Sequence, residues 1–275
     1  MTNNKHTIPG NDIYWTYHRA TLPVIIMIHG FRGTHHGLDL IAKKMPNNHI
    51  IVPDLPGFGE AKPLSQHGLD DYVLWLEQFI KSLNINMPPI LLGHSFGSIV
   101  TSAYAARYPS TISKLILVNP IGSPALEGPR ALLTKLALFY YWTGRKLPSG
   151  IAKKWLSAKP VVAIVTISMS KTKDKSLRRY IHDQHFAYFS RFHNTQSLSE
   201  SFSTSVNNNV RQFADKITVP TLLVVGEKDD ITPLHKQREL VELFPYGRIS
   251  VINDVGHLTH YETPDQVATA IEQFI

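Results

Sequence analysis

ILLGHSFGSIV, residues 90–100, is an apolar run that stops at a glycine, passes through a histidine and a serine, and resumes with small side chains. The G-x-S-x-G pattern at 93–97 is typical of a nucleophile elbow, a sharp turn between a strand and a helix that presents a serine. Glycines fit there because larger side chains would collide with neighbouring backbone. We therefore predict Ser95 as a nucleophile, with an ordinary turn serine as the alternative.

Short apolar runs alternate with helical runs on both sides of this stretch. The predicted strands are 24–28, 49–54, 89–93, 114–119, 221–226 and 248–253, and the predicted helices are 69–83, 98–108, 233–244 and 264–275. Strands that are apolar on both faces and alternate with helices form a parallel sheet. The predicted fold class is α/β, with a mostly parallel central sheet and helices on both faces.

About a hundred residues without strand alternation separate Asn119 from Thr221. A crossover between parallel strands needs only about a dozen residues, so the surplus is interpreted as an insertion. Three segments in it are predicted as helices: 130–142, 174–194 and 197–206. We assign 1–123 and 206–275 to the core, and 124–205 to an α-helical lid.

Composition and charge limit the cellular locations and the kinds of partner that we expect for this protein. The chain has 275 residues and no cysteine, and no secretory leader is recognised at its start. The longest apolar run, 161–167, is too short to span a bilayer, so we expect a soluble, cytoplasmic protein. Residues 124–216 carry 15 Lys and Arg against 5 Asp and Glu. This basic segment could attract an anionic substrate, a membrane surface or nucleic acid, but a solvated face is the favoured interpretation. We expect no nucleic-acid partner and no stable membrane insertion.

A serine nucleophile needs a base, and the base needs an acid to orient it. His257 follows the last predicted strand, and every parallel strand ends at the sheet edge where the nucleophile lies. His260 is the alternative base. Asp229 leaves the preceding strand at the same edge and is preferred as the acid over Asp230 and Asp254. The order Ser, Asp, His along the chain is that of α/β-hydrolases.

Two backbone amides are needed to stabilise an oxyanion. One is expected from Phe96, directly after the nucleophile. The other is expected from Phe31, in the loop after the first predicted strand, where Gly30 allows close approach. Gly30 and His94 are also candidates for substrate contact, with packing as the favoured role of His94.

Five motifs carry a resemblance to a known family: HGFRG (29–33), PDLPGFGEA (53–61), GHSFGS (93–98), GEKDDITP (226–233) and GHLTHYETP (256–264). The chain resembles the α/β-hydrolase superfamily, in its lid-bearing serine esterase or carboxylesterase-like branch. The resemblance implies that the acid is the residue three after the glycine of GEKD, which is Asp229. Some members place it after an earlier strand, where this chain has Asn119. Ser95 argues against the members that use an aspartate nucleophile.

We therefore expect a serine hydrolase that cleaves small carboxylic esters through an acyl-enzyme, without a metal or an organic cofactor. Large apolar residues of the predicted lid, Leu132, Leu136, Phe139, Tyr140 and Trp142, are expected to shape the acyl pocket. Alternatives on the same three side chains are hydrolysis of a C–C bond in a meta-cleavage-type diketone, and acyl transfer to an alcohol. A ligand-binding protein that keeps the fold without turnover is a further alternative. No oligomeric state is predicted.

Overall fold

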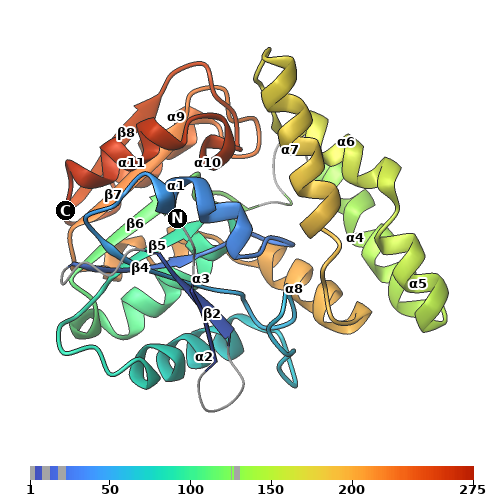
Figure 1. The fold of residues 1–275 in the computed structure, drawn as a ribbon, viewed down its shortest axis with the longest axis horizontal. Coiled ribbons are helices and arrows are strands. Elements are labelled where there is room, and N and C mark those ends of the chain that lie inside the picture. The colour runs from blue at the N-terminus through green and yellow to red at the C-terminus, as the bar shows by residue number, and fades with distance from the viewer. Residues whose placement is uncertain (1–3, 8–12, 18–22, 125, 127–130) are drawn as a thin grey trace.

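The computed structural model describes residues 4–7, 13–17, 23–124, 126 and 131–275. Within them, eight strands form one sheet in the order β1-β2-β4-β3-β5-β6-β7-β8 (Figure 1). The strands are β1 (Asn4–Thr7), β2 (Ile13–Tyr17), β3 (Val24–Ile28), β4 (His49–Pro53), β5 (Ile90–His94), β6 (Lys114–Val118), β7 (Thr221–Gly226) and β8 (Gly247–Ile252). Strands β3 to β8 pair in parallel, whereas β1 and β2 add an antiparallel edge.

The predicted α/β class with a mostly parallel sheet is confirmed, and the six predicted strands are β3 to β8. Strands β1 and β2 were not predicted from the sequence. They form an edge, where β1 is polar and mostly exposed. Such a strand lacks the continuous apolar run that marks a strand buried on both faces.

Alternate residues of each strand point to opposite faces, so the sheet has two cores. In β3, Ile26 and Ile28 pack on one face, and Ile25 and Met27 on the other. The first face is covered by α2 (Leu69–Ser82), α3 (Phe96–Arg107) and α9 (Leu234–Val241), and the second by α1 (Asp39–Lys43) and α11 (Pro264–Glu272). A further short helix, α10 (Thr259–Glu262), precedes α11.

Between β6 and β7, the described residues form five α-helices: α4 (Ala131–Lys146), α5 (Ser149–Leu156), α6 (Lys159–Met169), α7 (Lys175–Tyr188) and α8 (Thr195–Asn207). Helices α4 to α7 stand together at one side of the sheet, on the right in Figure 1. We call α4 to α8 the insertion. Helices α5 and α6 were not predicted, and α7 ends six residues before the predicted boundary at 194. Among the described helices, none is long and apolar enough to cross a bilayer.

The parallel register brings the carboxyl ends of β3 to β8 to one edge of the sheet. The loops that follow β3, β5, β7 and β8 all leave from this carboxyl edge, where open α/β sheets bind their ligands. The insertion starts from the same edge, after β6. The fold therefore brings the residues that follow these strands together, next to the insertion.

Several histidines are buried between this edge and the insertion, among them His94 and His185. Burial, reinforced by the neighbouring His257, lowers the pKa of His94 from 6.5 to about 3. Burial and the neighbouring His182 lower the pKa of His185 from 6.5 to about 4. Both imidazoles are therefore neutral in the folded protein and bind protons only after unfolding in mildly acidic solution.

We expect the folded state to lose stability as the pH falls from 6.5 toward 4. The unfolded state binds more protons than the folded state in this window, so each of these two histidines costs on the order of 2 kcal/mol at pH 5. Carboxylates contribute little there because their unfolded pKa lies near 4. Urea unfolding at pH 7.5 and pH 5.0 measures the difference.

Two variants test whether the buried imidazoles cause this pH dependence of stability. His185→Asn should reduce the difference between the two pH values, whereas His193→Asn, at an exposed position, should leave it unchanged. Equal unfolding free energies of the unsubstituted protein at the two pH values would contradict the expectation.

Candidate active site

Ser95 lies at the junction of β5 and α3 with φ 52° and ψ −117°. A non-glycine residue in this region of conformational space is strained and must be held by its surroundings. The flanking glycines explain how the turn closes. A Cβ at Gly93 would collide with Thr101 and with the backbone of Gly97, and a Cβ at Gly97 would collide with the carbonyl of Ile28. The tight turn therefore presents the Ser95 side chain at the carboxyl edge of the sheet.

The three side chains selected from the sequence as nucleophile, base and acid form one hydrogen-bonded chain. His257 Nε2 lies 2.9 Å from Ser95 Oγ, and His257 Nδ1 lies 2.7 Å from Asp229 Oδ2. A carboxylate can only accept, so Nδ1 carries the proton and Nε2 accepts from the Ser95 hydroxyl. His257 and Asp229 are almost completely buried. The imidazole is thus fixed in the tautomer that can take a proton from serine.

Asp229 is held ionised by its surroundings. Its Oδ1 accepts the backbone N–H groups of Ile231 at 2.8 Å and Thr232 at 3.0 Å. Its Oδ2 accepts the amide of Asn119 at 2.8 Å and the Thr232 hydroxyl. Burial alone would raise the pKa of Asp229, but the interaction with His257 and the hydrogen bonds from Thr232 lower it to about 2. The carboxylate is therefore charged at neutral and mildly acidic pH.

The alternative candidates for base and acid lie elsewhere. His260 is buried and packs on His94, with ring centroids 4.1 Å apart, and its Nδ1 has no hydrogen-bond partner among the described residues. Asp230 is half exposed and pairs with Lys171, and Asp254 is exposed and pairs with Lys228. The structure does not bring any of these three into the hydrogen-bonded chain at the serine.

The loop after β3 lies against the serine. A Cβ at Gly30 would be 3.2 Å from Ser95 Cβ and 3.1 Å from His94 Nδ1. His29 fixes this loop: its Nε2 accepts from Leu55 N–H at 2.8 Å, so its Nδ1 carries the proton and donates to Gly30 O at 2.8 Å. The loop closes in a turn with Gly33 N–H donating to Gly30 O. Phe31 follows Gly30 in this turn, and Phe96 begins α3, so the two predicted amide donors belong to segments that adjoin Ser95.

Arg32, in the same turn, joins the loop to the insertion. Its Nε donates to Phe189 O at 2.8 Å, its Nη2 to Leu156 O at 2.8 Å, and its Nη1 to the hydroxyl of Tyr141 at 3.3 Å. Its guanidinium also lies 4.6 Å from the ring centroid of Phe189. The side chain is buried, and within the described chain it has no carboxylate partner. One cation thus holds α4, the end of α5 and the end of α7 to the loop beside the serine.

A small cavity of about 60 Å³ adjoins Ser95. Its walls come from the loop after β3, from the end of β5, from the start of α10, and from α6 and α7 of the insertion. The residues from the insertion are Met169, Gln184, His185, Tyr188 and Phe189. The cavity is thus closed on one side by α7.

Five residues of α4 were expected in the acyl pocket, but none of them lines the cavity at Ser95 among the described residues. Leu136, Phe139 and Trp142 are more than half exposed. Phe139 and Trp142 border a separate, open hollow between α4 and α8. Tyr140 donates its hydroxyl to Trp155 O, and burial raises its pKa to about 12. Leu132 is also exposed.

Arg32, Asn119 and Thr232 contribute to the site but were not assigned a role from the sequence. Asn119 has φ 45°, which is unusual for a residue other than glycine. The only sequence feature that could have indicated its role is an asparagine directly after an apolar strand. Arg32 stands within the HGFRG motif that directed attention to Phe31. Its contacts are with residues 109 to 157 positions away, so no local pattern could have indicated them.

A model of the alpha/beta hydrolase fold family matches residues 23–264. The chain is 26% identical over 271 residues to Lipase 3 of Moraxella sp. (strain TA144), across 95% of this chain and 80% of the relative. It is 26% identical over 277 residues to a monoacylglycerol lipase of Bos taurus, across 92% of this chain and 75% of the relative. A thermophilic esterase from Thermogutta terrifontis superposes with a TM-score of 0.78 at 20% identity, covering 99% of this chain and 97% of that chain. With the family model spanning nearly the whole chain, and with lipases among its relatives, the protein belongs to the α/β-hydrolase fold family, in its esterase and lipase branch.

Proposed function

We propose that this protein is a serine hydrolase that cleaves carboxylic esters through an acyl-enzyme on Ser95. The observation that carries the proposal is the unbroken hydrogen-bonded chain from Ser95 Oγ through His257 to the buried Asp229 carboxylate. A serine hydroxyl becomes nucleophilic when a base accepts its proton, and this chain supplies an oriented base. The similarity to lipases and to a monoacylglycerol lipase supports a carboxylic ester as the bond that is cleaved.

The reaction follows from these positions. Ser95 Oγ attacks the ester carbonyl carbon while His257 Nε2 takes the hydroxyl proton, and Asp229 stabilises the imidazolium. The carbonyl oxygen becomes an oxyanion, which the amides of Phe31 and Phe96 stabilise. The C–O bond of the alcohol then breaks, and His257 returns the proton to the departing oxygen. Water repeats both steps on the acyl-enzyme and releases the acid, leaving Ser95 and His257 as they began.

The cavity size supports a preference for short acyl groups. A cavity needs about 10–15 Å³ to hold one water molecule, so the 60 Å³ cavity has room for about four or five water-sized groups, enough for an acyl group of a few carbon atoms. Longer acyl chains require α7, which forms one wall, to move away from the loop after β3. Arg32 holds that wall in place.

A fluorophosphonate probe should label the protein stoichiometrically, and p-nitrophenyl acetate and butyrate should be hydrolysed faster than the decanoate. Ser95→Ala should abolish labelling and turnover. Ser102→Ala is the matched control, because Ser102 is a buried serine of α3, the helix that follows Ser95, and its hydroxyl has no partner in the described structure. This control should retain both properties.

Other outcomes of this assay would redirect the proposal. No labelling of the unsubstituted protein would indicate a ligand-binding protein that does not turn over. Labelling with faster cleavage of a meta-cleavage diketone than of any ester would indicate C–C hydrolysis. An ester product formed in the presence of added alcohol, in preference to the free acid, would indicate acyl transfer.

Asp229→Asn should lower kcat by roughly 10⁴-fold, because an amide can donate to His257 Nδ1 and so favours the wrong tautomer. Asp230→Asn changes the adjacent, half-exposed carboxylate that pairs with Lys171. It should leave kcat within about twofold, because an exposed ion pair contributes little. Ester hydrolysis by the two variants is compared under identical conditions. Equal rates would remove Asp229 from the proposed mechanism.

Arg32→Met should reduce kcat by roughly tenfold to a hundredfold, because the loop that carries the Phe31 amide loses its attachment to the insertion. Arg32→Lys should be intermediate, since an ammonium cannot reproduce the fork geometry. Arg191→Met, at an exposed guanidinium packed on Tyr188, is the control. Limited proteolysis should cut the insertion faster in Arg32→Met than in the control. Unchanged turnover and unchanged proteolysis would show that Arg32 does not hold this loop.

A further inference from the structure

The positive charge of the protein is concentrated in four helices of the insertion. Residues 131–188, which comprise α4 to α7, contain 11 Lys and Arg and 2 Asp and Glu, a net charge of +9. The whole chain has 28 and 21, so the remainder has 17 and 19, a net charge of −2. One fifth of the chain therefore accounts for all of the net positive charge.

The same helices expose most of the large apolar side chains. Of 16 such exposed side chains among the described residues, 11 lie in residues 131–188: Leu132, Leu136, Phe139, Trp142, Leu147, Ile151, Trp155, Ile164, Ile167, Tyr180 and Phe186. Single exposed apolar residues need no explanation, but a concentration of this kind on one part of a protein marks an interaction site.

The exposed apolar residues follow helical spacing. Leu132, Leu136, Phe139 and Trp142 recur at intervals of three and four along α4, so they share one face of that helix. Ile164 and Ile167 repeat this spacing on α6, where they are 66% and 64% exposed. An apolar stripe at helical spacing normally faces a core, whereas these stripes face outward.

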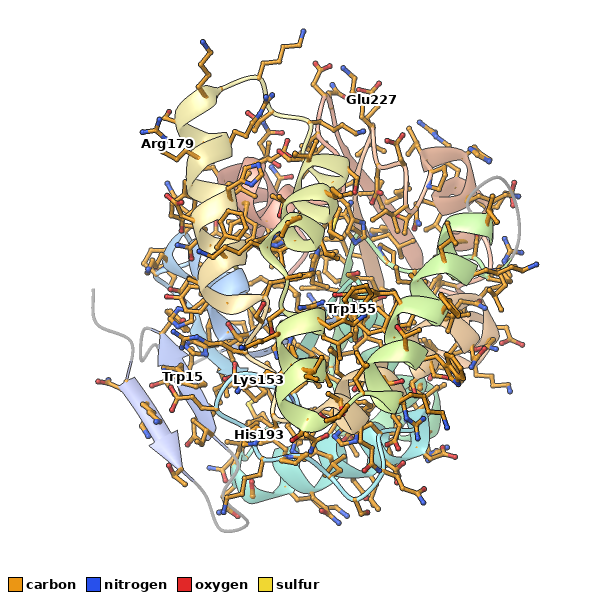
Figure 2. All side chains as sticks on the ribbon, turned by 90° about the vertical axis from the view of Figure 1, so that its right-hand side faces the viewer. Trp15, Lys153, Trp155, Arg179, His193 and Glu227 are labelled. Atoms are coloured by element: carbon orange, nitrogen blue, oxygen red, sulfur yellow. The ribbon has the colours of Figure 1, made fainter. Side chains whose placement is uncertain are left out.

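The helices present this surface together. Figure 2 looks onto the side of the molecule formed by the insertion and shows α4 to α7 spread across it, with Trp155 and Lys153 on α5 and Arg179 on α7. The ring centroids of Trp155 and Tyr140 lie 5.4 Å apart, which joins α5 to α4. We call the exposed side chains of residues 131–188 the outer face of the insertion.

Ten basic residues of the outer face are exposed and, within the described chain, have no carboxylate at ion-pair distance: Lys135, Arg145, Lys146, Lys153, Lys154, Lys159, Lys173, Lys175, Arg178 and Arg179. The eleventh, Lys171, pairs with Asp230. The outer face thus combines uncompensated cations with leucine, isoleucine, phenylalanine and tryptophan.

We propose that the outer face of the insertion docks onto the surface of an anionic phospholipid bilayer. Basic side chains are attracted to the surface of an anionic membrane, and apolar side chains of an amphipathic helix enter the boundary between headgroups and acyl chains. A bilayer surface is a partner that uses both components of this face. No helix needs to span the membrane for such binding.

The other possible partners use only part of the face. A nucleic acid would pair with the cations but gains nothing from the exposed Leu and Ile side chains. A second copy of the protein would cover the apolar residues, but it would bring two faces of net charge +9 into contact. Charge complementarity therefore favours the bilayer.

Vesicle co-sedimentation tests the proposal with the full chain carrying Ser95→Ala, so that the result does not depend on the proposed ester hydrolysis. The bound fraction on vesicles of 30% phosphatidylglycerol in phosphatidylcholine should be at least tenfold higher than on phosphatidylcholine alone. Raising the salt from 0.05 M to 0.5 M should reduce the binding, because the Debye length shortens. Equal binding to both kinds of vesicle, or binding to neither, would overturn the proposal.

Two double variants on the outer face, each with a matched control elsewhere on the chain, locate the docking surface. Lys153→Glu/Lys154→Glu should reduce binding to anionic vesicles at least tenfold. Lys62→Glu/Lys216→Glu makes the same change in charge at exposed positions outside the insertion and should not reduce binding. Ile164→Ser/Ile167→Ser should also weaken binding, whereas Leu74→Ser/Met87→Ser, exposed apolar residues of the core, should not. In a protein with an intact Ser95, each of the four double variants should leave hydrolysis of p-nitrophenyl acetate unchanged. Equal losses from insertion and core variants would contradict a docking face on the insertion.

The same proteins distinguish the competing partners. Binding to a single-stranded oligonucleotide that is stronger than binding to anionic vesicles would replace the bilayer by nucleic acid. A dimer in light scattering that dissociates in Ile164→Ser/Ile167→Ser would replace it by a second copy of the chain. Either result would overturn membrane docking as the role of this face.

Discussion

The backbone of Ser95 is the constraint on which the rest of the site depends. At φ 52° and ψ −117°, this serine occupies a conformation that costs on the order of 1–3 kcal/mol, and the sheet must hold it there. The surroundings do so by close approach: Gly93 and Gly97 lie where a Cβ would collide with neighbouring atoms, and Ser95 N–H donates to Val118 O of the next strand. The strain therefore fixes the direction of the nucleophile before any substrate arrives.

The electrostatics of the site follow from the same crowding. Burial opposes charge on Asp229, so the carboxylate needs several donors, and Ile231, Thr232 and Asn119 supply them around His257. Asn119 also accepts from the Thr259 hydroxyl, which ties the end of β6 to the helix that follows His257. A charged acid in a dry site polarises the imidazole more strongly than it could in water. Burial lowers the pKa of His94 and of His260, so both remain neutral and do not oppose the positive charge that His257 gains in the reaction.

The features that could be predicted from the sequence are those that depend on apolar patterning and on the alternation of strands and helices. Strands β3 to β8 follow from their Ile, Leu and Val runs, and the convergence of Ser95, Asp229 and His257 follows from the shared carboxyl edge of parallel strands. Strand β1 could not be predicted because its residues are polar and it pairs only at an edge. The prediction that α4 side chains shape the acyl pocket assumed that apolar side chains in an insertion face inward, whereas Leu136, Phe139 and Trp142 are exposed. The role of Arg32 depends on contacts over more than a hundred residues, which no local pattern encodes.

The insertion has two faces that satisfy different physical demands. Its inner face meets the core through buried polar contacts, such as Arg32 to Leu156 O and Tyr72 to Ser201, where each unpaired donor would be costly. On its outer face, Ile164 and Ile167 are largely exposed, so packing within the fold does not require either side chain to be apolar. Polar residues at helical surface positions would be equally compatible with the fold and would lower the risk of aggregation. An apolar, basic outer face therefore has its explanation outside the folded chain, in a partner that is itself both anionic and apolar.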